Sequence, residues 1–121
     1  MAAPAARLIE LFAEINAQLM SRTARVLALG ESAASADPQL AELRERGHAT
    51  MRSDFQAVAQ ALAAQGALAG DVDVDTAAAT IHGIVNESVY LRLIDGCGWT
   101  SDRYHDWLAR VLAKALLTGA E

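Results

Sequence analysis

The segment Gly98–Leu117, with the sequence GWTSDRYHDWLARVLAKALL, is the most informative part of the chain. Thr100 is a typical helix N-cap, and Asp102 lies in the first turn, where a carboxylate is favoured by the helix dipole. The apolar residues that follow recur every three or four positions, which is typical of a helix with a buried face. We therefore predict a helix that begins after Thr100. Its buried stripe comprises Tyr104, Leu108, Val111 and Ala115.

Two long helices are predicted in the first half of the chain. From Pro4, which suits a first helical turn, apolar residues recur at helical spacing until Gly30, where we expect the helix to end. Asp37 and Pro38 then supply an N-cap and a first helical residue, and the apolar pattern runs on to Gly66.

A third helix is predicted between these two and the C-terminal segment. Asp73 is its expected cap, and the apolar pattern continues to about Asp95, where the run Gly96–Gly98 favours a turn. Together the segments predict an all-α fold of four to five helices without a strand.

Composition limits the kind of protein that this chain forms. With 121 residues it is long enough for one domain, 1–121, with one core. The net charge of -5 argues against nucleic-acid binding by this chain alone, because phosphate backbones are bound mainly by Lys and Arg. The single cysteine, Cys97, makes no internal disulfide, and we find neither a signal peptide nor a membrane span, so we expect a cytoplasmic location without membrane contact.

The last two predicted helices carry more apolar surface than one core needs. Placed at 100° per residue, the apolar arc of the third helix covers about 200°, and that of the fourth about 180°. A second copy of the chain is the simplest cover for the extra face, which gives a dimeric four-helix bundle. The alternative is a monomer with a central fourth helix. The predicted interface residues are Ile84, Ser88, Leu91, Tyr104, Trp107, Leu108, Val111 and Ala115.

The run Gly98–Ala109, followed by Leu112 and Leu116, resembles the ending of many tetracycline-repressor (TetR) family transcription regulators. The stretch 87–93 is similar to the family's penultimate helix. The resemblance implies an all-helical C-terminal regulatory domain that dimerises through its last two helices and encloses a pocket for a small-molecule effector.

The chain departs from the family pattern at its start. A family member begins with a helix-turn-helix domain that binds DNA, whereas this sequence enters the regulatory pattern almost at once. We therefore expect DNA contact only through an absent N-terminal domain. A fragment of a larger repressor and a shortened relative that has lost DNA binding are both compatible with this. A stand-alone helical dimerisation or interaction module without a pocket is a further alternative.

Candidate pocket residues are large or polar side chains on otherwise apolar faces. Met20, Met51 and Phe55 are adaptable apolar liners, and ordinary core packing is their alternative role. His82 and Asn86 lie one turn apart at the margin of the third helix's apolar arc. They suit either a polar group of a ligand, or each other and a partner across the dimer. Tyr90 follows nearer the polar side.

Nothing in the sequence indicates an enzyme. His48, His82 and His105 lie on different predicted helices without the spacing of a metal site, and no glycine-rich phosphate loop or nucleophile elbow is present. We therefore predict no catalytic residue, no metal ligand and no cofactor.

Overall fold

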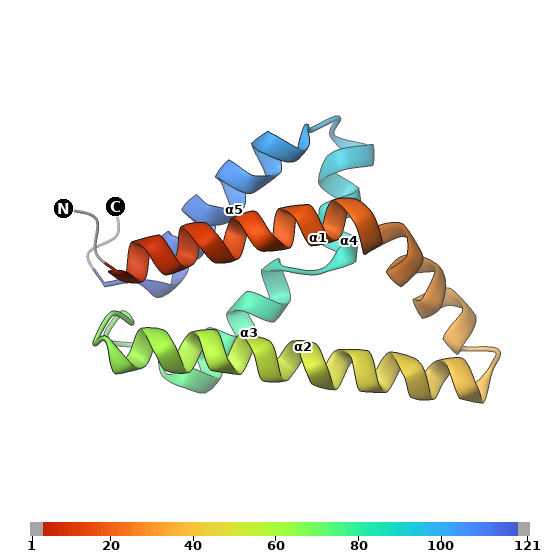
Figure 1. The fold of residues 1–121 in the computed structure, drawn as a ribbon, viewed down its shortest axis with the longest axis horizontal. Coiled ribbons are helices and arrows are strands. Elements are labelled where there is room, and N and C mark those ends of the chain that lie inside the picture. Colours follow the sequence, from red (N-terminus) through yellow and green to blue (C-terminus); the bar gives the residue numbers. More distant parts are fainter. Residues whose placement is uncertain (1–3, 119–121) are drawn as a thin grey trace.

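The computed structural model describes residues 4–118, and within them the fold is all-α, as predicted. The elements are α1 (Pro4–Ala34), α2 (Pro38–Ala64), α3 (Val74–Ile84), α4 (Glu87–Leu91), the π-helical turn η1 (Arg92–Gly96) and α5 (Ser101–Leu116). The two long helices, α1 and α2, meet at one end of the molecule through a short turn (Figure 1). Helix α3 packs against α2, whereas α4 and α5 pack against α1.

The predicted caps are confirmed. The side chain of Asp37 accepts a hydrogen bond from the Gln39 N–H at the start of α2, and Pro38 is the first residue of that helix. Asp73 caps α3 and Thr100 caps α5, with distances of 2.7 and 3.1 Å to the backbone nitrogens three residues on. The turn after η1 is also confirmed, because Gly98 has a φ of +72°, which glycine adopts without strain.

The predicted end of the first helix at Gly30 is wrong. Helix α1 continues through Gly30 to Ala34, because Glu31, Ala33 and Ala34 are acceptable helix formers and one interior glycine costs only about 1 kcal/mol. The helix ends just before Asp37, the residue that precedes Pro38, where proline disfavours helical geometry.

The prediction of one continuous third helix is also wrong. Val85 and Asn86 are both extended, with ψ of 91° and 164°, and they divide the segment into α3 and α4. Asn86 ends one helix and begins the next. Its Oδ1 accepts from the Val89 N–H at 2.9 Å, and its Nδ2 donates to the His82 carbonyl at 3.1 Å. The predicted apolar arc of about 200° applies only to one straight helix. Because the segment is divided into α3 and α4, the arc does not correspond to a single face.

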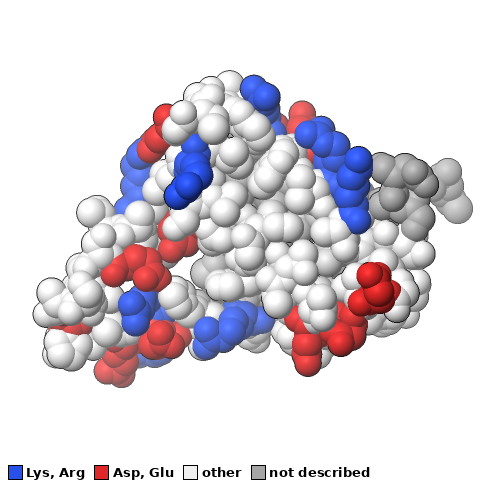
Figure 2. Space-filling view, turned by 180° about the vertical axis from the view of Figure 1, so that it is seen from behind, with Lys and Arg blue, Asp and Glu red and all other residues white. Residues whose placement is uncertain are grey.

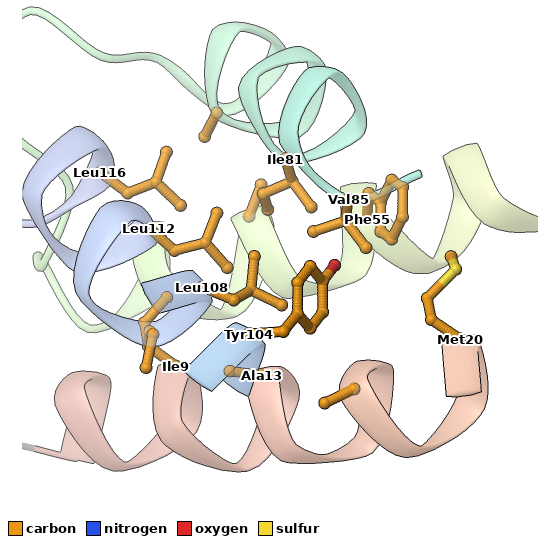
Figure 3. Packing of buried hydrophobic residues seen from close by; sticks show 14 of the residues in the cluster. Ile9, Ala13, Met20, Phe55, Ile81, Val85, Tyr104, Leu108, Leu112 and Leu116 are labelled. Atoms are coloured by element: carbon orange, nitrogen blue, oxygen red, sulfur yellow. The ribbon is translucent and has the colours of Figure 1, made fainter. Parts of the chain in front are cut away.

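The core lies where α1, α2, α3 and α5 converge (Figure 3). Its largest fully buried side chains are Tyr104, Ile9, Met20, Leu62, Ile81, Leu108, Leu112, Leu116 and Val85. The segment after α2 closes one end, because the Ala69 N–H donates to the Leu116 carbonyl at 2.8 Å and the Thr118 N–H donates to the Ala67 carbonyl at 2.9 Å.

Tyr104 has an unusual environment in this core. Its side chain is fully buried, and its hydroxyl, which points toward Val85 and Phe55 (Figure 3), has no hydrogen-bond partner among residues 4–118. Burial raises the pKa of Tyr104 from 10.0 to about 12, because the phenolate would lose its hydration. A raised folded-state pKa means that the stability present below pH 10.0 is lost as the pH rises toward about 12.

We expect Tyr104→Phe to leave the free energy of unfolding at neutral pH unchanged, or to raise it by about 1 kcal/mol, because it removes a buried hydroxyl without an acceptor. At alkaline pH its advantage over the parent chain should widen, by up to about 2 to 3 kcal/mol. Urea unfolding followed by circular dichroism at neutral and alkaline pH measures both effects. A variant less stable than its parent at every pH would contradict the prediction.

Candidate functional site

An open groove of about 560 Å³ lies between the second half of α1 and the first half of α2. Its apolar lining consists of Leu19, Val26, Leu27, Leu40, Leu43 and Met51. Its polar lining consists of Thr23, Glu31, Arg44, His48, Thr50 and Glu87, and the glycines Gly30 and Gly47 complete the wall. The groove therefore combines apolar walls with a few polar groups, which is the usual make-up of a small-molecule site.

The shape of α1 contributes to this groove. The helix curves in its second half before it turns into α2 (Figure 1). The hydroxyls of Ser21 and Thr23 donate to the carbonyls of Gln18 and Leu19 at 2.7 and 2.8 Å. Hydrogen bonds of this kind compete with the helix ladder and often bend helices.

A cluster of charged side chains forms part of the groove wall. Glu31 contacts His48 at 2.8 Å, between Oε1 and Nε2, and its other oxygen lies 3.7 Å from Arg44. The Arg44 guanidinium also lies 3.6 Å from Glu45, and its Nε is buried without a hydrogen-bond partner among residues 4–118. Figure 2 shows acidic and basic side chains intermixed at this end of the molecule.

Of the three apolar liners predicted from sequence, only Met51 lies in the groove. Met20 and Phe55 are buried in the core, which is the alternative that the sequence left open for them. The Phe55 ring lies edge-on to Phe12, with ring centroids 5.9 Å apart, and at the same distance from the ring of His82. These side chains pack the interior next to the groove.

The three predicted polar candidates lie outside the groove. His82 is half-buried beside Phe55, and its Nδ1 has no hydrogen-bond partner in the described chain. Asn86 caps α4 and bonds to the His82 carbonyl, so the two are joined through the backbone. The expectation that Tyr90 lies nearer the polar side is wrong. The break at Asn86 turns α4, and Tyr90 is buried edge-on against Tyr104, with ring centroids 4.8 Å apart.

The residues predicted for a dimer interface divide into two groups. Tyr104 and Leu108 are fully buried within one chain, so they have no surface left for a second subunit. The others retain surface: Ser88 is exposed, and Ile84, Leu91, Trp107, Val111 and Ala115 are half-buried. Trp107 packs on Trp99, and the Arg103 guanidinium lies 4.5 Å above the Trp99 ring.

Sequence reasoning missed most of the groove. Leu40 and Leu43 belong to the apolar stripe of the second helix, yet they are 37% and 56% exposed. The sequence did indicate that this stripe is not fully buried. Arg44 and His48 directly follow Leu43 and Gly47 on the same stretch of helix. A fully buried stripe rarely has charged residues so close to it.

Other kinds of site find no support in residues 4–118. No group of three or more His, Cys, Asp or Glu side chains in this range is placed to hold a metal ion. Within the same range, no helix has the length and apolar character that crossing a bilayer requires. No protein-family model, curated protein or solved structure matches the chain.

Asn86 gives a prediction that separates capping from ligand binding. We expect Asn86→Ala to lower the free energy of unfolding by about 1 kcal/mol, because the first turn of α4 loses its cap. Asn86→Asp retains the oxygen that accepts from Val89 and should lose less. Urea unfolding of both variants measures the difference. Equal stability of Asn86→Ala and the parent chain would contradict the capping role.

Proposed function

We propose that this chain is a regulatory domain similar to those of TetR-family regulators, and that a small apolar molecule binds in the groove between α1 and α2. The observation that carries the proposal is the groove itself, with six apolar side chains and the contact between Glu31 and His48 in its wall. Its volume of about 560 Å³ suits a drug-sized ligand. Leu40 and Leu43 would leave water when such a ligand binds, and each buried methylene contributes about 0.8 kcal/mol.

The same groove offers a route from ligand binding to a change elsewhere. Arg25 precedes the groove residues Val26 and Leu27, and its guanidinium binds both carboxylate oxygens of Asp95 at 2.7 and 2.8 Å. Asp95 belongs to η1, which leads through a turn into α5. A ligand that favours one spacing of α1 and α2 would therefore bias the position of α5. In a TetR-like regulator, such a bias would alter DNA binding by a helix-turn-helix domain outside these residues.

A stand-alone interaction module is the second candidate. Eight large apolar side chains on α1 and α2 are more than a third exposed, which is more than a small ligand would cover. Large exposed apolar patches mark protein–protein contacts in many soluble proteins. A homodimer fits both candidates. The TetR resemblance alone would place its contact on the last two helices, whereas the exposed large apolar side chains lie on α1 and α2.

Gly47→Leu tests the ligand site. A Cβ at Gly47 would meet no atom within 4 Å, and Gly47 lines the groove, so we expect a leucine there to fill part of it. We expect the neutral dye N-phenyl-1-naphthylamine to bind the parent chain and to bind this variant at least about tenfold more weakly, a difference of about 1.4 kcal/mol. Fluorescence titration measures the two affinities.

Gly83→Leu is the matched control. Gly83 is an exposed helical glycine on α3, outside the groove, and it also has open space around its Cα. Both variants should be at least as stable as the parent, because leucine favours helix over glycine by up to about 1 kcal/mol. Equal dye binding by all three chains, or none by the parent, would contradict the proposal.

A further inference from the structure

The two sides of α1 differ in the size of their apolar residues. The side that packs on α4 and α5 is rich in alanine, and Ala13, Ala17 and Ala24 are at most 4% exposed. Ile9 and Met20 are also buried on that side, whereas five further large side chains lie on the opposite side and are exposed. They are Leu11, Ile15, Leu19, Val26 and Leu29, with exposures from 39% to 70%, and we call them the outer stripe.

The outer stripe has the geometry of a helix-pairing surface. Its members follow one another at steps of four, four, seven and three residues, and at 100° per residue Leu11, Ile15 and Leu19, which precede the curved part of α1, fall within an arc of about 80°. The stripe spans 18 helical steps, or about 27 Å of helix at 1.5 Å per residue. An apolar strip this narrow and long fits another helix laid along it.

Charges along the same side of α1 indicate the direction of that helix. Glu14 lies beside the N-terminal half of the outer stripe, Arg22 falls within the arc of its C-terminal half, and Arg25 lies beside that half. Glu14 and Arg22 have no ion-pair partner within residues 4–118. An antiparallel second copy, with its two-fold axis near Gln18, brings Glu14 opposite Arg22 in both directions. A parallel copy would instead place like charges together.

We infer that the outer stripe of α1 is a docking surface for a second copy of this chain, with the two α1 helices antiparallel and Glu14 paired with Arg22 of the other copy. In this register Ile15 lies beside Leu19 of the second copy, and Leu11 lies near Val26. The inference does not rest on ligand binding in the groove, but because Leu19 and Val26 also line the groove, a second copy docked here would cover part of its wall. It places the contact on the first helix, away from the half-buried side of α5 that contains Trp107 and Val111.

Charge reversal tests this register. Glu14→Arg and Arg22→Glu should each weaken self-association about tenfold or more, because like charges then oppose one another across the two-fold axis. An equimolar mixture of the two variants should recover association, since each mixed pair again joins opposite charges. Sedimentation equilibrium over a concentration series measures all three samples and the parent chain.

Matched controls exclude a general effect of charge. Asp54→Arg and Arg52→Glu make the same changes at exposed positions on α2 and should associate as the parent does. Ile15→Glu should give a monomer with unchanged helix content, because Ile15 is 62% exposed and does not support the core. Val111→Glu should leave association intact.

Three results would overturn the inference. The first is a parent chain that stays monomeric to millimolar concentration. The second is dissociation by Val111→Glu but not by Ile15→Glu, which would place the contact on the last two helices. The third is a crossed mixture that associates no better than either charge variant alone.

Discussion

The close packing that alanine permits along α1 is the constraint on which the rest of this structure depends. Ala13, Ala17 and Ala24 have no side chain beyond Cβ, so α4 and α5 pack directly against the α1 backbone surface. Bulky side chains from the other helices, such as Tyr104 and Leu108, then fill the core opposite these alanines. Helix α1 therefore adds few large side chains to the core, chiefly Ile9 and Met20, whereas α5 supplies Tyr104, Leu108, Leu112 and Leu116.

The exposed apolar surface follows from this division. Because the core uses the small-residue side of α1, the large residues Ile15 and Val26 remain outside it, at 62% and 69% exposure. The groove has the same origin, because α1 curves toward α2 beyond the end of the core and leaves Leu27 and Leu43 without a covering helix. The bidentate pair between Arg25 and Asp95 lies where these regions meet. A surface pair of this kind contributes little to the free energy of unfolding. It matters here because it joins α1 to η1.

Much of the fold is predictable because it depends on local chemistry. The caps Asp37, Asp73 and Thr100 act through hydrogen bonds to residues two or three positions away, which sequence alone determines. The break at Asn86 depends on local chemistry too, since its amide caps α4, but the apolar spacing on both sides concealed it. Extending one helix through Asn86 then misplaced Tyr90, because a helical arc is meaningful only while the helix is straight.

The site was less predictable because periodicity identifies a helix without saying which side of it is buried. In α1 the spacing of Leu19 and Val26 is helical, and the alanines on the other side have the same period. Hydrophobicity alone would favour burial of the leucine side of α1. The alanine side is buried instead, since small residues let α5 approach closely. That choice depends on the partner helix and not on α1 alone. Which apolar side stays free, and hence where a ligand or a second copy can bind, is therefore a property of the assembled helices.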